Sequence, residues 1–315
     1  MRRLLSLPAA YARDLAAGVV RGWDAFFFTP ADPLPLGVIR IITGALLLWS
    51  MAVTGLDLHA FLGADGWADP TVARAFLADR GGLGWSLWFA VPDALLVPAY
   101  AAVMVVLALF TVGLGSRTTA VLAWVVAVST SRRVPVMLFG FDQIVAIWTF
   151  YLAVTGSAGQ ALSVDRLLAR RRGQFGLPMP TVSANLALRL IQLHLCVIYG
   201  MAGLAKLQGP AWWDGTAFGL VLLTKEFRSL IDVSWLLKFP VAVNLATHLT
   251  MAFELLYPAL IWNKLARPLL LLTAVVLHVG IGTTLGLNEF GLAMIAGNLA
   301  FVSAETLRGK VAEPN

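Results

Sequence analysis

A single lysine ends a hydrophobic segment in YGMAGLAKLQGPAWWDGTAF (199–218), and two tryptophans and an aspartate follow it closely. The chain has only five lysines, and arginine is its usual cation. An amine can lose its proton in an apolar site and then act as a base near neutral pH, whereas a guanidinium stays protonated. Lys206 is therefore the first candidate for a catalytic residue, as the acceptor of a proton.

Lys206 also ends a stripe of polar and small residues that a helix would bring to one face. Gln192, Cys196, Tyr199, Gly203 and Lys206 follow one another at spacings of four, three, four and three, which is the periodicity of one helix face. Polar groups inside a membrane span are costly and normally face a bundle interior or an aqueous cavity. The stripe predicts an intramembrane site with Gln192 and Tyr199 as binding residues.

Two further apolar segments carry ionisable residues. Segment 241–262 holds Glu254 on one face with His248 at its border, and segment 267–287 holds His278 near its middle. Glu254 and His248 are candidates for binding substrate or cofactor. For Glu254 and His278, a structural role as hydrogen-bonded groups inside a bundle is an equally good interpretation.

Arginines and tryptophans near span ends offer further binding candidates. Arg132 and Arg133 lie in STSRRVPVMLFGFDQ (129–143). In the expected orientation this segment is on the outer side of the membrane, where basic residues are otherwise scarce. The two arginines could therefore bind an anionic substrate or lipid phosphate. Trp212 and Trp213 could contact a substrate, but composition favours anchoring in an interfacial aromatic belt. Anchoring is also the common role of a lysine at a span end, so it stays open for Lys206.

Composition places the chain in a membrane. It is 59% hydrophobic and 13% charged, against about 45–50% and about 25% in soluble domains. The basic residues that give the net charge of +6 lie in short loops between apolar segments. This distribution is the one that orients a protein in a membrane, so we expect no nucleic-acid partner. The single cysteine, Cys196, excludes an intrachain disulfide. We expect no metal site.

The order of apolar segments predicts an all-α polytopic membrane bundle of about eight spans. Residues 1–30 form an amphipathic interfacial segment, 31–303 the transmembrane domain, and 304–315 a cytoplasmic tail. The expected spans are 34–54, 93–114, 118–138, 141–162, 184–207, 241–262, 267–287 and 289–303.

Arginines set the expected orientation. The densest basic loop is SVDRLLARRRGQF (163–175), and such loops stay in the cytoplasm. We therefore expect both termini to be cytoplasmic, with Lys206 and the two tryptophans after it at the outer face. The expected location is the inner or plasma membrane of a bacterium.

Four segments of the chain resemble the horizontally transferred transmembrane (HTTM) domain family, whose best-known branch is the vitamin K-dependent γ-glutamyl carboxylase. The most specific is the Lys206 segment, which is similar to the block that holds the catalytic lysine of the carboxylase. The others are LGVIRIITGALLLW (36–49), GFDQIVAIWTFYLAV (140–154) with SVDRLL (163–168), and VLHVGIGTTLGLNEFGLAMIAGNLAF (276–301).

The resemblance implies a reaction and its participants. Lys206 would deprotonate reduced vitamin K or menaquinol, with O2 and CO2 as co-reactants, and His278 would match the histidine of the closing segment. Asp142 or Gln143 stands where the carboxylase has a histidine, so one catalytic group is altered. A peptide or protein is the implied substrate, and membrane lipid surrounds the site.

Two other functions stay open. A second branch of the family, similar to the sporulation-delaying protein B, acts in maturing a secreted peptide toxin, although the adjacent cysteines expected there are absent. A non-catalytic membrane component that binds a lipid, a peptide or a partner protein is the remaining interpretation. The oligomeric state does not follow from these patterns.

Overall fold

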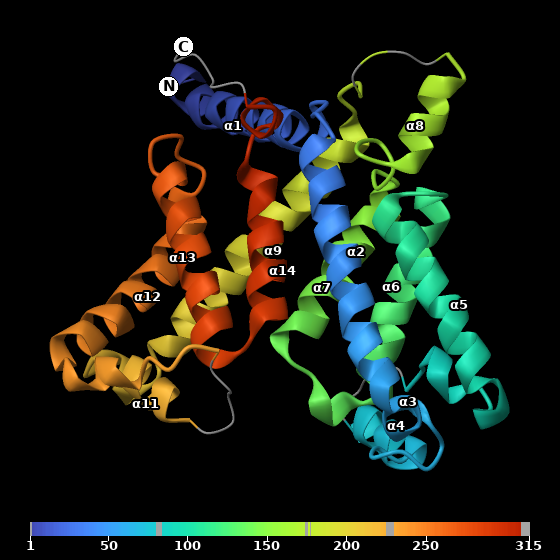
Figure 1. The fold of residues 1–315 in the computed structure, drawn as a ribbon. Helices are drawn as coiled ribbons and strands as arrows, with labels where there is room; N and C mark the ends of the chain where they lie inside the picture. The colour runs from blue at the N-terminus through green and yellow to red at the C-terminus, as the bar shows by residue number, and fades with distance from the viewer. Residues whose placement is uncertain (1, 80–83, 174–175, 177, 225–229, 310–315) are drawn as a thin grey trace.

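The computed structural model describes residues 2–79, 84–173, 176, 178–224 and 230–309, with the backbone alone for residues 2–10 (Figure 1). The described residues form helices and one isolated β-bridge, between Ala31 and Thr181. The expectation of an all-α chain is confirmed for this part of the sequence.

Each of the eight expected spans corresponds to a helix. These helices are α2 (Leu34–Thr54), α5 (Asp93–Val112), α6 (Ser116–Arg133), α7 (Gly140–Thr155), α9 (Val182–Lys206), α12 (Pro240–Leu260), α13 (Arg267–Leu285) and α14 (Asn288–Asn298). The remaining α-helices are α1 (Arg2–Phe28), α3 (Leu58–Leu62), α4 (Pro70–Asp79), α8 (Val164–Arg171), α10 (Pro210–Trp213), α11 (Ala217–Leu223) and α15 (Ala304–Leu307). Short 3₁₀ segments are Gly55–Asp57, Leu87–Phe89, Pro135–Met137, Ser234–Lys238 and Leu299–Phe301.

Fewer helices than expected meet the requirements of a membrane span. Within the described residues, four stretches are long and apolar enough, namely Leu34–Leu62, α5, α9 and α13. Helix α14 has 11 residues, which cover about 16 Å at about 1.5 Å per residue, against a hydrocarbon core of about 30 Å. The chain thus has the helices of an integral membrane protein, while the count of about eight spans stays a prediction.

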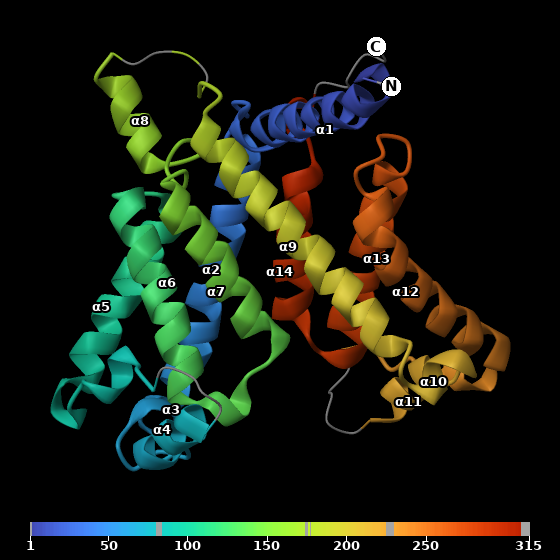
Figure 2. The same ribbon diagram turned by 180° about the vertical axis from the view of Figure 1, so that it is seen from behind.

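Helices α2, α9 and α14 occupy the middle of the bundle, and α7 packs against all three (Figures 1 and 2). Helices α5 and α6 lie on one side of this centre, and α12 and α13 lie on the other. Helix α1 lies across one end, with its described side chains 11–25 exposed. This placement suits an interfacial helix, and the interfacial role stays a prediction.

Side chains just before the helices fix where several of them begin. Ser163 accepts a hydrogen bond from the Arg166 amide at the start of α8, and Thr181 accepts one from the Ala184 amide at the start of α9. These N-caps satisfy amides that have no partner within the helix. The start of α9 in turn sets the position of Lys206 at its other end.

Arg40, in the second turn of α2, is fully buried. Its guanidinium donates to the backbone carbonyls of Ala158, Ala161 and Leu162, in the loop between α7 and α8. A carbonyl in an apolar bundle needs a donor from the protein itself. Arg40 therefore fixes the loop that carries α8.

Asp165 in α8 completes the connection to α6. Its carboxylate accepts hydrogen bonds from the amides of Gly115 and Ser116, at 2.9 and 2.7 Å. Burial favours the neutral acid, but these hydrogen bonds and the nearby Arg40 charge prevail and hold the pKa of Asp165 below its usual value. The carboxylate therefore stays charged beside Arg40 at neutral pH.

Arg133 plays the same part at the opposite end of the bundle. It is fully buried, and it donates to the carbonyls of Leu62, Gly63 and Ala68. The guanidinium thus fastens the loop between α3 and α4. This gives Arg133 a structural role, whereas the sequence placed it among residues that bind a substrate.

Replacing Arg40 with Met should lower the free energy of unfolding by about 3 kcal/mol or more, because three carbonyls lose a donor and each buried unpaired group costs about 1–3 kcal/mol. Thermal unfolding of the purified protein in detergent measures the change. The control is Arg172→Gln, at an exposed position, which should change stability by less than about 0.5 kcal/mol. Equal stability of the two variants would contradict the anchoring role of Arg40.

Helices α1 and α8 lie at one end of the bundle, and α10 and α11 lie at the other (Figures 1 and 2). We expect the first end to be cytoplasmic. With Cys196 replaced by Ala, an impermeant maleimide added to intact cells should label Ser234→Cys and should label Arg172→Cys only after permeabilisation. The opposite pattern would reverse the orientation.

Candidate functional site

Lys206 forms an ion pair with Glu254, and the distance between Nζ and Oε2 is 2.6 Å. Lys206 is the last residue of α9, and Glu254 lies in α12. The two helices approach closely at Gly203, where an added Cβ would lie 3.0 Å from the backbone nitrogen of Leu255. A small residue one turn before Lys206 thus permits the contact that brings the two charges together.

A cavity of about 510 Å³ lies beside this ion pair. Its wall combines the charged pair with aromatic and aliphatic side chains of α11, α12 and α13, including Phe218, Phe253 and Leu277. The Trp212 ring also lines it, and Lys206 Nζ lies 4.9 Å from the centre of that ring. An apolar chamber with a few convergent polar groups is the usual form of a small-molecule site.

His278 lies behind this cavity in a buried hydrogen-bond network. Its Nε2 atom is 2.7 Å from the hydroxyl of Tyr199, and Asn298 Nδ2 donates to the same hydroxyl at 3.0 Å. Tyr257 donates to Asn298 Oδ1 at 2.7 Å. The network joins α9, α12, α13 and α14 in the centre of the bundle, and the sequence alone did not single out Asn298 or Tyr257.

The sequence carries a signal that could have singled out Tyr257 and Asn298. Tyr257 lies three residues after Glu254, on the same side of α12, and Asn298 is the polar residue of the otherwise apolar stretch FGLAMIAGNLAF (290–301). A buried amide of this kind needs partners. Arg40 carries the same signal, because it is a charge in an apolar segment.

The polar stripe of α9 does not form one site. Fourteen residues separate Gln192 from Lys206, about 21 Å along a helix. Gln192 donates to the carbonyl of Ala300 and accepts from Arg189, near the middle of α9 and away from Lys206. Tyr199 lies between them in the buried network. The structure therefore brings Lys206 together with Glu254 and Trp212, and it leaves Gln192 apart.

Asp142 lies in the first turn of α7 and not beside Lys206. Its Oδ2 atom accepts a hydrogen bond from the Phe139 amide at 2.9 Å, which caps the helix. It lines a different cavity, of about 450 Å³, together with Glu289 and Phe290. Among the described residues, none lines both this cavity and the Lys206 cavity.

The other binding candidates also lie outside the Lys206 cavity. Trp213 is exposed and donates to the Leu207 carbonyl at 2.8 Å, and the Nδ1 atom of His248 is 3.0 Å from the Asn244 carbonyl. Arg132 is half-buried at the end of α6 and does not line this cavity. Of the eleven predicted site residues, Lys206, Glu254 and Trp212 line the cavity, and Tyr199 and His278 form the network behind it.

The fold and the site together define a helical membrane protein with a polar network in its bundle and a charged pair at the edge of an apolar cavity. A family model for the HTTM domain matches residues 28–305, so the chain belongs to the HTTM domain family. This confirms the resemblance seen in the sequence. No curated protein and no solved structure matches the chain.

Replacing Asn298 with Leu should lower the free energy of unfolding by about 2–4 kcal/mol, because it removes partners of two buried tyrosine hydroxyls. Tyr257→Phe removes one hydrogen bond and should cost about 1 kcal/mol. In the double variant the two costs should not add, because both belong to one interaction. Chemical denaturation in detergent measures all three variants, and additive costs would contradict a shared network.

Proposed function

We propose that the chain is a carboxylase-like membrane enzyme that uses reduced vitamin K or menaquinol, with the Lys206 cavity as its active site. The observation that carries the proposal is the Lys206–Glu254 pair at the edge of an apolar cavity. Membership of the HTTM family supports it, because the vitamin K-dependent carboxylase is one branch of that family. Residues of this cavity can be assigned to the chemistry at the quinol hydroxyl group and to the binding of the quinol ring.

The cavity suits an aromatic, lipid-borne ligand. Its volume of about 510 Å³ lies within the range of about 300–1,000 Å³ typical of small-molecule pockets. Trp212, Phe218 and Phe253 would contact the ring, and Lys206 with Glu254 would meet the hydroxyl group. When bound, the reduced quinone would supply, together with O2, the strong base that the family reaction requires, and CO2 would be the added group.

The ion pair allows Lys206 to act as a proton acceptor. A charged pair and its neutral form differ only in the position of one proton, which can pass from Lys206 to Glu254 over the 2.6 Å between Nζ and Oε2. When the proton lies on Glu254, Lys206 is a neutral amine that can accept a proton from a hydroxyl group. Glu254 thus holds the proton that Lys206 must lose before it can act as a base.

His278 and Asp142 take more distant roles in this proposal. His278 holds Tyr199, whose ring packs 5.2 Å from the ring of Phe253 in the cavity wall. Asp142 borders a second cavity on the same end of the bundle as the Pro135–Met137 segment.

With the termini in the cytoplasm of a bacterial cell, the Lys206 cavity lies near the outer face, where a peptide or protein substrate would meet it.

A non-catalytic role is the second candidate, and one observation favours it. Asp142 or Gln143 stands at the place of a carboxylase histidine, and Oδ2 of Asp142 accepts a helix-capping hydrogen bond. A chain without that catalytic group could still bind a lipid, a peptide or a partner protein in the same cavity.

Lys206→Arg should abolish quinol turnover, with a loss of about 100-fold or more, because a guanidinium cannot accept the proton. Purified protein receives reduced vitamin K or menaquinol and O2, and mass spectrometry measures the epoxide and the oxidised quinone. Glu254→Gln should also lose turnover, since it removes the group that takes the lysine proton. Lys264→Arg, at an exposed position between α12 and α13, is the matched control and should keep full activity.

The same assay separates the alternatives. If Lys206→Arg matches the wild type while Lys206→Ala fails, the site requires a positive charge and the base lies elsewhere. If the wild-type protein turns over none of the quinols, the non-catalytic role becomes the better conclusion.

A further inference from the structure

A polar pocket lies at the end of the bundle that α1 crosses (Figures 1 and 2). It has a volume of about 330 Å³ and is formed by residues 31–35, the first half of α9, the turn between α12 and α13, and residues 300–305. Gln192, a binding candidate from the sequence, lines it together with Arg189 and Arg267. The proposed enzyme reaction does not use this pocket, so its charged groups need another explanation.

The guanidinium of Arg189 is held in a fixed position. Its Nε atom donates to the Phe26 carbonyl at 3.1 Å, and its Nη1 atom donates to Gln192 Oε1 at 2.9 Å. The guanidinium carbon lies 4.2 Å from the centre of the Phe26 ring. Gln192 is itself buried and donates to the Ala300 carbonyl at 2.7 Å. Among the described contacts, the Nη2 atom of Arg189 has no hydrogen-bond partner.

Arg267 lies at the same pocket, at the start of α13. Its Nε and Nη2 atoms donate to the carbonyls of Ile261 and Trp262, at 3.1 and 3.3 Å. Its Nη1 atom receives no partner from the part of the chain that the structure describes. Both arginines are half-buried. Each thus keeps one terminal nitrogen, with two N–H donors, that no described group satisfies, while its other nitrogens fix its position.

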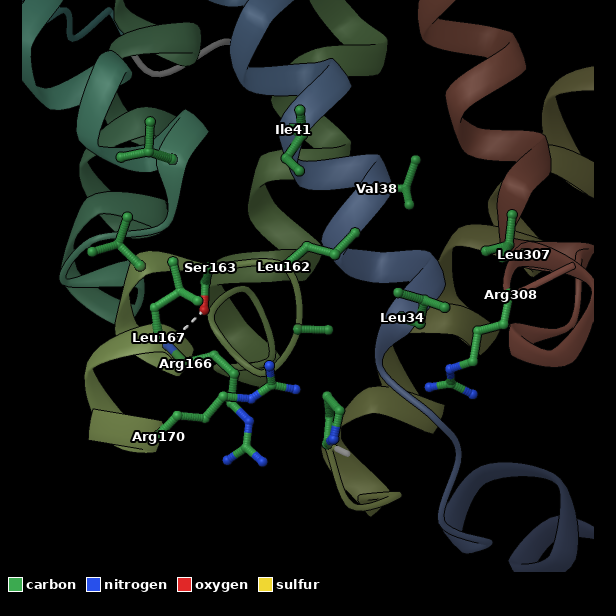
Figure 3. A pocket seen from close by; sticks show the side chains of 14 residues that line it. Leu34, Val38, Ile41, Leu162, Ser163, Arg166, Leu167, Arg170, Leu307 and Arg308 are labelled. Atoms are coloured by element: carbon green, nitrogen blue, oxygen red, sulfur yellow. Dashed lines mark hydrogen bonds between the residues drawn. The ribbon is translucent and has the colours of Figure 1, made fainter. Parts of the chain in front are cut away.

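The charges of these two arginines are not balanced by a carboxylate. Within the described residues, neither Arg189 nor Arg267 forms an ion pair. Two acids line the pocket, Asp32 and Glu305. Asp32 is paired at 2.6 Å with Arg308, which lies at the edge of an open groove of about 760 Å³ between α2 and α8 (Figure 3). Glu305 is exposed, so water screens its charge.

We propose that this pocket binds a phosphate group, which Arg189 and Arg267 hold between them. Two half-buried guanidiniums without an acid are costly, and an anion with several oxygens can accept hydrogen bonds from both. The planar guanidinium suits phosphate in particular. A lipid headgroup and a soluble phosphate compound both carry such a group, and the test separates these two sources. The proposal does not depend on the chemistry at Lys206.

The test uses the full chain, purified in detergent and stripped of lipid. Native mass spectrometry follows the binding of dioleoyl phosphatidic acid and of dioleoylglycerol, which has the same acyl chains and lacks the phosphate. Isothermal titration calorimetry follows the binding of inorganic phosphate. We expect saturable binding of at least one of the two phosphate probes and weaker binding of dioleoylglycerol.

Three variants make the test specific. Arg267→Gln should weaken binding by about tenfold or more, because it removes a charge-assisted hydrogen bond. Lys264→Gln removes the same charge from an exposed position that does not line the pocket, and it should leave binding unchanged. Glu305→Gln removes a negative charge from the pocket and should strengthen binding by about twofold to fivefold. Its side chain is exposed, so this variant keeps the test valid if Arg267→Gln disturbs the turn.

The results separate the sources and can overturn the site. Saturable binding of phosphatidic acid alone would assign the phosphate to a lipid headgroup, and binding of inorganic phosphate alone would assign it to a soluble compound. Equal losses in Lys264→Gln and Arg267→Gln would show general attraction to positive charge and would overturn the proposal. Absence of saturable binding for both phosphate probes would overturn it as well, as would binding that neither Arg267→Gln nor Glu305→Gln changes.

Discussion

Backbone and side-chain polar groups inside this bundle must find their partners within the chain, because a lipid environment offers none. Two fully buried arginines meet this requirement where the chain leaves its helices. Arg40 donates hydrogen bonds to the carbonyls of the loop between α7 and α8, and Arg133 donates to those of the loop between α3 and α4. Each arginine turns an irregular loop into a fixed support for the elements beside it.

The centre of the bundle satisfies the same requirement with neutral groups. Asn298 links Tyr199 to Tyr257, and Tyr199 also reaches His278. Because these residues come from four different helices, the network sets the position of α13 and α12 relative to α9. The Lys206 cavity lies between these helices, so its shape depends on groups that do not line it.

The two ends of the molecule handle charge in different ways. Near the end of α9, one lysine and one glutamate form a pair at the edge of an apolar cavity, and the pair is neutral as a whole. Near α8, arginines gather at a groove with no acid among its described lining residues. A neutral pair suits proton transfer with a neutral hydroxyl group, whereas Arg166 and Arg170 of α8 donate hydrogen bonds to a backbone carbonyl, that of Gly176.

The sequence by itself determined the class of the protein, the family and the approximate ends of the helices. Composition determined the class of the protein, because a membrane can surround so many apolar side chains. The Lys206 segment and three other segments indicated the family. Helix periodicity also placed Lys206 and Tyr199 on one face of α9. The same periodicity could not show that Gln192 lies apart from the Lys206 cavity, because a stripe about 21 Å long passes through several environments.

Tertiary structure alone decided which helices meet. Glu254 becomes the partner of Lys206 because Gly203 lets α12 approach α9, and Arg133 becomes a structural residue because a loop 70 residues earlier in the chain folds against it. The sequence shows that a buried charge needs a partner, but it does not show which one. That choice depends on distances between segments far apart in the chain, which helix packing sets and local spacing does not.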